Sequence, residues 1–144
     1  MAARARIAEM NNRASALFLE GDMAMAEALF GGAIAQMSPG EDDLAGMVYE
    51  NLGMARFNPK KYRPAVRAFM RALRESVAMR PQSAAFIVRA LTEIGAWDDA
   101  RMWLERHEEV LGPHPGGLTA RDIDARQREA ARQANEARGG PERG

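Results

Sequence analysis

The chain has 144 residues, no cysteine, and 20 basic against 20 acidic residues, so its net charge is zero. The lack of cysteine excludes disulfides, thiolate metal sites and cysteine nucleophiles. Zero net charge excludes a global field that would draw the chain onto nucleic acid or an anionic membrane. Alanine, arginine, leucine, methionine and glutamate are plentiful while β-branched residues are scarce. This composition predicts a single all-α domain.

The first helix is expected within residues 1–21, which contain no continuous apolar block. The segment therefore resembles neither a secretory signal nor a membrane span, and we expect a cytoplasmic protein without membrane insertion. Gly21 is expected to end this helix in a left-handed conformation, and Asp22 to cap a second helix over about residues 23–37.

The clearest pair of amphipathic helices lies within residues 49–81. The first of them is expected to be capped by Asp42 or Asp43 and to end near Phe57, because the Asn-Pro pair that follows disfavours helix. The second is expected to begin near Tyr62, with a proline in its first turn, where the missing amide hydrogen costs nothing.

Small residues on both helices of this pair predict a close crossing. Gly53 and Ala65 present almost no side chain, so we expect them to face each other, with aromatic residues filling the space on either side. Such a hairpin leaves a second apolar face open and needs neighbouring hairpins to cover it.

The last third of the chain predicts three further helices. Ser83 is expected to cap one helix that reaches about Ile94, and a second is expected over about residues 97–111. After a Gly-Pro-His-Pro-Gly-Gly break, Thr119 and Asp122 form a capping-box pattern.

The helix that this capping box begins is expected to extend to about residue 138. Its few apolar residues include Leu118, just before the cap, and Ile123, which we expect to cover the last hairpin. Residues 139–144 are expected to form a disordered tail.

The hairpin pattern occurs three times. Ala26, Ala65 and Ala100 lead three equivalent helices, 39 and 35 residues apart. Each unit closes with a proline: Pro39, Pro81 and Pro113. Periods of this length predict an array of helical hairpins.

This pattern resembles the tetratricopeptide repeat over about residues 7–113, with units at about 7–39, 44–81 and 82–113. The resemblance implies a right-handed α-α superhelix of three hairpins. Residues 114–138 would then form a breaker loop and a C-terminal covering helix.

The resemblance also implies a concave groove lined by the first helix of each hairpin. Methionine and phenylalanine in such a groove would suit an amphipathic helix or a peptide of another protein. The alternative is that these side chains pack between hairpins, which we favour for Phe57. The expected groove residues are Asn11, Ser15, Phe18, Met47, Glu50, Asn51, Met54 and Arg89, with Leu19 and Gln82 at neighbouring positions.

Four arginines form a stripe on the second helix of the middle hairpin: Arg63, Arg67, Arg71 and Arg74. Their spacing places them on one face, where they could meet an acidic partner or phosphates. The alternative is a solvated face, partly neutralised by residues 41–43 and Glu50. No aromatic residue interleaves the stripe, which disfavours nucleic acid.

No residue pattern supports an enzyme. His107 and His114 are the only histidines, and neither has a second ligand at metal-binding spacing. Neither GxGxxG nor a P-loop occurs. The acidic pairs Asp42-Asp43 and Asp98-Asp99 are interpreted as helix caps. We therefore expect no catalytic residue, metal site or cofactor.

The resulting hypothesis is a non-catalytic adaptor that captures a partner segment in the groove. A tetratricopeptide chaperone for a secreted or membrane-inserting substrate of a bacterial secretion system is the alternative. Two further hypotheses are an electrostatic binder that uses the arginine stripe, and self-association in which the helix containing Ile123 enters the groove of a second copy.

Overall fold

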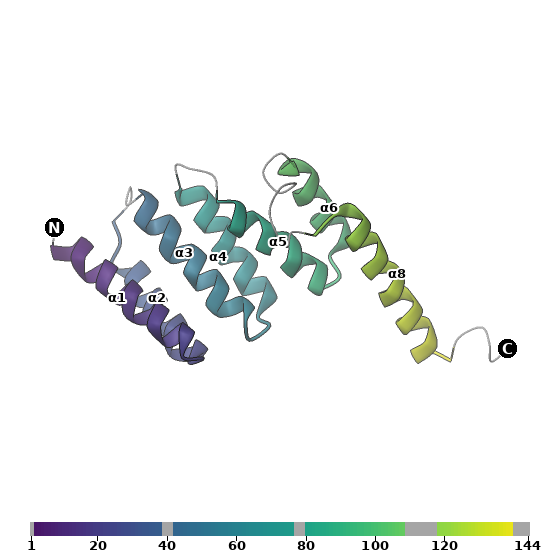
Figure 1. The fold of residues 1–144 in the computed structure, drawn as a ribbon, viewed down its shortest axis with the longest axis horizontal. Helices are drawn as coiled ribbons and strands as arrows, with labels where there is room; N and C mark the ends of the chain where they lie inside the picture. The colour runs from purple at the N-terminus through teal and green to yellow at the C-terminus, as the bar shows by residue number, and fades with distance from the viewer. Residues whose placement is uncertain (1, 39–41, 77–79, 109–117, 140–144) are drawn as a thin grey trace.

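The computed structural model describes residues 2–38, 42–76, 80–108 and 118–139, which are helical apart from short turns and contain no strand (Figure 1). This confirms the all-α prediction. The helices are α1 (Ala2–Leu19), α2 (Met23–Ala35), α3 (Asp42–Phe57), α4 (Tyr62–Glu75), α5 (Pro81–Glu93), α6 (Trp97–Arg106) and α8 (Ala120–Ala137). None of these helices combines the length and the apolar character needed to cross a membrane.

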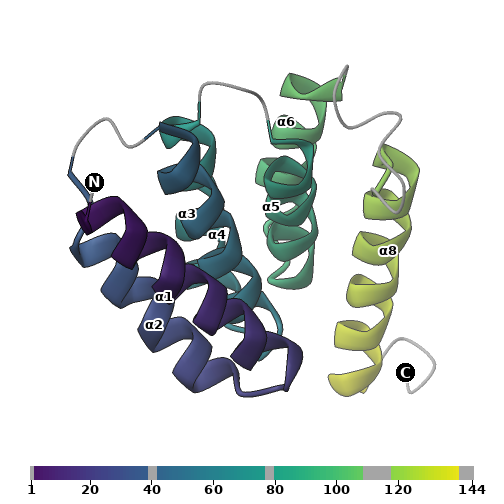
Figure 2. The same ribbon diagram turned by 60° about the vertical axis from the view of Figure 1, so that its left-hand side comes forward.

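The helices from α1 to α6 follow one another in chain order, and each packs against the one before it (Figure 1). α3 also contacts both α1 and α5, so the odd-numbered helices are neighbours along one side. α8 packs against α6, and its C-terminal half extends beyond α5 and α6 (Figure 2).

Several helix ends lie where local chemistry predicted them. Gly21 has a φ of 89°, and the side chain of Asp22 accepts a hydrogen bond of 3.2 Å from the backbone N–H of Met25. The Thr119 hydroxyl accepts from the backbone N–H of Asp122 at 3.2 Å, and the Asp122 carboxylate accepts from the backbone N–H of Thr119 at 2.9 Å. These contacts confirm the cap at Asp22 and the capping box.

One predicted helix start and one predicted cap are wrong. α5 begins at Pro81 and not after Ser83, because Pro81 suits the first helical position, where its missing N–H costs no hydrogen bond. α6 has Ala96 as its N-cap, so Asp98 and Asp99 lie in the first turn and are not caps. In that turn their charges favourably oppose the positive end of the helix dipole.

Two helices end earlier than predicted. α2 ends at Ala35, and α6 ends at Arg106. After α2 the Gln36 N–H donates to the Ala33 carbonyl, three residues back, which tightens the last turn. After α6 the His107 N–H donates to the Trp103 carbonyl, four residues back, at 3.1 Å. The prediction for residues 109–111 lies outside the described residues.

The core consists of two clusters that meet at α4. The first contains Ala68 together with residues of α1 to α3, among them Ile7, Phe30 and Val48. The second contains Ala65 and Phe69 of α4 together with residues of α5, α6 and α8. Because α4 supplies side chains to both clusters, it links the two halves of the chain.

At the close crossing of α3 and α4, Gly53 lies against the ring of Phe69. A Cβ atom added at Gly53 would lie 2.6 Å from two ring carbons of Phe69, and the three nearest atoms all belong to that ring. Gly53 thus makes room for Phe69, one turn beyond Ala65, and Ala65 is buried in the second cluster. Position 53 therefore requires a small residue, because a larger side chain would collide with the Phe69 ring.

α8 is attached by one buried side chain and by polar contacts. Ile123 is 0% exposed in the second cluster, and Leu118 packs beside it. Arg101 of α6 donates to Asp124 at 2.8 Å and to Gln127, and Arg126 pairs with a glutamate at the end of α5. Self-association through Ile123 would therefore require α8 to leave the core of its own chain.

Candidate functional site

A pocket of about 250 Å³ lies where α1, α3 and α5 meet. It is lined by Ser15, Phe18 and Leu19 of α1, Phe30 of α2, Asn51 and Met54 of α3, and Gln82 of α5. The three odd-numbered helices thus all contribute side chains to one pocket.

The apolar part of the pocket bridges the two core clusters. Phe18 packs against the first cluster, and Met54 packs against the second. Leu19 stands at the rim with 84% of its surface exposed, which is the largest exposure among the large apolar side chains of the described residues. An apolar side chain bound in this pocket would therefore contact Phe18 and Met54, which pack against the core, and the exposed Leu19.

The polar part of the pocket is held in place by a bond between two helices. The side-chain amide of Asn51 donates to the side-chain oxygen of Asn11 at 3.0 Å, and Asn11 is only 4% exposed. Ser15 donates to the backbone carbonyl of Asn11 at 2.9 Å. Asn51 is thus positioned by α1 although it belongs to α3.

The structure brings five of the eight expected groove residues together. Ser15, Phe18, Asn51 and Met54 line the pocket, and Asn11 lies behind Asn51. Phe30 is the one lining residue that the repeat pattern did not assign to the groove, because it belongs to the second helix of its hairpin. Phe30 is buried in the core, and its sequence position predicts that core role and gives no sign that the side chain also reaches the pocket.

Glu50 connects α3 to the start of α5. Its carboxylate accepts a hydrogen bond of 2.6 Å from the Ser83 hydroxyl and pairs with Arg80 at 3.5 Å. These contacts join α3 to the start of α5. Glu50 is consequently a structural tether between two helices and does not line the pocket.

Arg89 and Met47 also lie away from the pocket lining. The guanidinium of Arg89 lies over the rings of Phe86 and Phe57, at 5.1 and 5.8 Å from their centroids. Phe57 also packs edge-on against Tyr62, with ring centroids 5.3 Å apart, which agrees with the packing interpretation of this residue. Met47 is 38% exposed on α3.

The arginine stripe on α4 is exposed along its whole length. Arg71 pairs with Glu75 at 3.0 Å and lies over the ring of Tyr49. The other three arginines make no ion pair with any described residue. Glu50 is engaged by Arg80, so it does not neutralise the stripe as predicted. The side chains of residues 41–43 lie outside the described part of the chain.

His107 lies at the C-terminal end of α6 and stacks on Trp103, with ring centroids 4.8 Å apart. Its Nε2 atom is buried and has no hydrogen-bond partner among the described residues. Burial, followed by the charge of Arg106, lowers the pKa of this imidazole, so it is neutral at physiological pH. His114 lies outside the described residues, and no group of metal-binding side chains was found within them.

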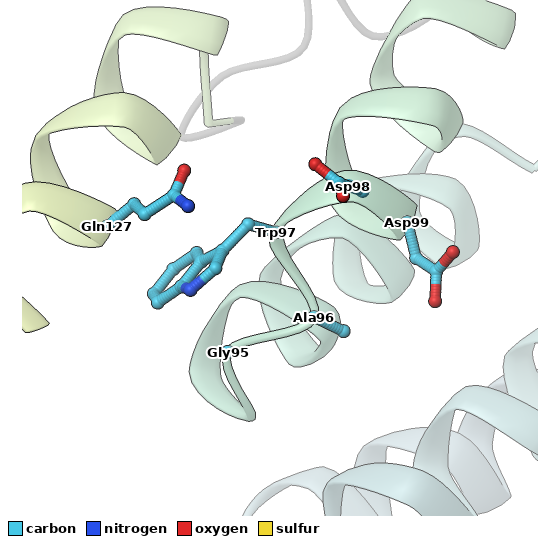
Figure 3. A pocket seen from close by; sticks show the side chains of 6 residues that line it. All are labelled: Gly95, Ala96, Trp97, Asp98, Asp99 and Gln127. Atoms are coloured by element: carbon cyan, nitrogen blue, oxygen red, sulfur yellow. The ribbon is translucent and has the colours of Figure 1, made fainter. Parts of the chain in front are cut away.

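A second pocket, of about 350 Å³, lies between the α5–α6 turn and α8 (Figure 3). The indole of Trp97 and the side chain of Gln127 face each other across it, while the carboxylates of Asp98 and Asp99 diverge. Sequence reasoning missed this pocket because its two walls are 30 residues apart and meet only when α8 packs on α6. The divergent carboxylates do not form a binding constellation.

No protein-family model matches the chain, and no curated protein matches it significantly. The resemblance to the tetratricopeptide repeat therefore rests on the three units in the sequence.

Proposed function

We propose that the chain is a non-catalytic protein-binding adaptor of the tetratricopeptide type, which holds a helix or peptide segment of a partner between α1, α3 and α5. The observation that carries the proposal is the convergence of three successive odd-numbered helices on one pocket. In this proposal the pairs α1–α2, α3–α4 and α5–α6 are the three hairpins of a right-handed superhelix, and α8 covers its last face.

The chemistry of the pocket favours a segment with one large apolar side chain. Phe18 and Met54 offer adaptable apolar contact, and burying a leucine-sized side chain against them would contribute about 1.5–3 kcal/mol. Asn51 and Gln82 provide amide groups that can bond to the backbone beside that side chain. Such a ligand would be anchored by one residue and oriented by its main chain.

The exposed rim supports a second candidate function. Leu19 is apolar and almost fully exposed at the edge of the pocket, so it extends the apolar surface that a bound apolar segment would cover. A chaperone for a secreted or membrane-inserting substrate would use the same pocket. It would bind the unfolded substrate and release it on folding, whereas an adaptor would bind the folded partner.

The pocket is tested by selecting helical peptides from a displayed library on the full chain and measuring their affinity for two variants. Leu19→Glu is expected to lower the affinity for the selected peptides at least tenfold, because it places a charge on the apolar rim of the pocket. Met102→Glu is the matched control, since Met102 is also exposed but lies on α6. Equal loss in both variants, or none in either, would contradict the proposal.

A further inference from the structure

The outer face of α4 carries three unpaired arginines around one exposed methionine. Arg63, Arg67, Met70 and Arg74 follow one another at i, i+4, i+7 and i+11, so they form a row about 16 Å long on one side of the helix. Buried Ala65, Ala68, Phe69 and Ala72 occupy the opposite side. The row therefore points away from the core.

The charge of this row is not balanced by the chain itself. Arg63, Arg67 and Arg74 make no ion pair within the described residues, whereas neighbouring Arg71 is occupied by Glu75. The chain as a whole has as many acids as bases, so the excess on α4 reflects placement and not composition.

Several basic residues also lie at the N-terminal end of α4, where the helix dipole disfavours positive charge. Lys60, Lys61 and Arg63 surround the start of α4, and its first turn contains no acid. Positive charge there opposes the helix dipole, while negative charge would be favoured. Glu27 engages Lys61 at 2.9 Å, but no described acid pairs with Lys60 or Arg63. An acidic ligand at this end would relieve the repulsion and meet the dipole as well.

Met70 distinguishes between the classes of anionic ligand. It is 38% exposed in the middle of the row, where it offers apolar contact to a partner side chain. A phosphate backbone gains nothing from such a contact, and no exposed aromatic residue is present on this face to stack a base. A single methionine is too little apolar surface to hold α4 on a membrane.

We propose that the outer face of α4 docks an acidic amphipathic helix of a protein partner. Carboxylates of that helix, spaced to match, would pair with Arg63, Arg67 and Arg74, and one apolar side chain would rest on Met70. The face lies on an even-numbered helix and shares no residue with the pocket between α1, α3 and α5. The two surfaces can therefore bind independently.

The test uses a fluorescent helical peptide with glutamate at i, i+4 and i+11 and leucine at i+7, and its affinity for the full chain is measured by anisotropy. The triple variant Arg63→Glu, Arg67→Glu, Arg74→Glu is expected to weaken binding by about tenfold or more, because each pair becomes repulsive. Met70→Ser is expected to weaken it by roughly threefold or more through lost apolar contact. A peptide of the same composition in scrambled order should bind more weakly than the matched one.

The matched control reverses two exposed arginines of α8 and the exposed arginine that follows it: Arg121→Glu, Arg128→Glu and Arg138→Glu. It changes the net charge equally, so retained binding supports a defined site on α4. Equal loss in both triple variants would overturn the proposal, and so would tighter binding of single-stranded RNA or phosphatidylserine vesicles at the same salt. Leu19→Glu should leave the peptide affinity unchanged, and loss of binding there would show that the peptide occupies the pocket instead.

Discussion

α4 and α8 are both rich in arginine, but the two helices use it differently. In α8, Arg126 pairs with Glu93, and Arg132 pairs with both Glu129 and Glu136. On α4 only Arg71 has an acidic partner among the described residues. α8 carries four acids beside its four arginines, whereas α4 carries Glu75 alone beside its four. The excess positive charge of α4 therefore remains available to another molecule.

The two helices also differ in how they are held. α4 buries four residues and contributes to both core clusters. α8 buries only Ile123 within its described length. Exposed charge is therefore found on a helix of either kind, and the arginines of α4 stand on the one that buries more residues.

The largest expected effect is on the free energy of unfolding, and it should differ between α4 and α8. Phe69→Ala should lower the global free energy of unfolding by about 3–5 kcal/mol, because it leaves a cavity at the junction of α3 and α4. Ile123→Ala should instead release α8, with loss of amide-exchange protection in α8 and retention elsewhere. Denaturant unfolding and hydrogen exchange measure the two outcomes.

Met70→Ala is the control for Phe69, because the neighbouring residue is exposed. Its effect should stay within about 0.5 kcal/mol, as is usual for surface positions. If Phe69→Ala were equally mild, α4 would not link the core clusters. Global unfolding by Ile123→Ala would show that α8 is as integral to the core as α4.

A second prediction concerns Glu27, which accepts from Arg56 at 3.1 Å and from Lys61 at 2.9 Å. The hydrogen bond from Lys61 is the largest influence that lowers the pKa of this carboxyl group. A lowered folded-state pKa means that the stabilisation is fully present above the ordinary pKa of glutamate. It is lost as the pH falls from there through the folded-state value.

Glu27→Gln should therefore reduce stability by roughly 1–2 kcal/mol at pH 7 and by progressively less below about pH 4.3. Melting temperatures of both proteins across this pH range measure the difference. A gap that stays constant down to the lowest pH would show that the ion pairs contribute nothing and that the glutamine merely packs less well.

The smallest expected effect is a gain in stability. Arg63→Gln removes a positive charge from the start of α4 and should stabilise the chain by about 0.3–1 kcal/mol. The same variant should weaken binding of the acidic peptide, so stability would rise while affinity falls. A loss of stability would indicate that Arg63 has a structural role, and the contrast between α4 and α8 would fail at that position.

Local chemistry made much of the fold predictable. Gly21, Asp22 and Thr119 act on residues within three or four positions of themselves, so their sequence context identifies them. Each of these features depends on short-range spacing.

Contacts across long sequence separations were not predictable. Ser83 was interpreted as a helix cap, yet its partner is Glu50, 33 residues earlier. The bond between Asn11 and Asn51 spans 40 residues, and either asparagine alone suits a helix surface equally well. Phe30 entered the pocket from a helix that the pattern assigned to the other side. Such assignments depend on how hairpins stack, which no local pattern specifies.

The binding pocket can be tested most directly through its methionine. The chain has ten methionines, whose ε-methyl groups can be labelled with carbon-13 and followed by NMR as a library-selected helical peptide is added. The account predicts that the Met54 methyl resonance shifts in proportion to occupancy, while those of Met25, Met70 and Met102, exposed on other helices, remain in place. A shift at Met70 or Met102 with none at Met54 would contradict it.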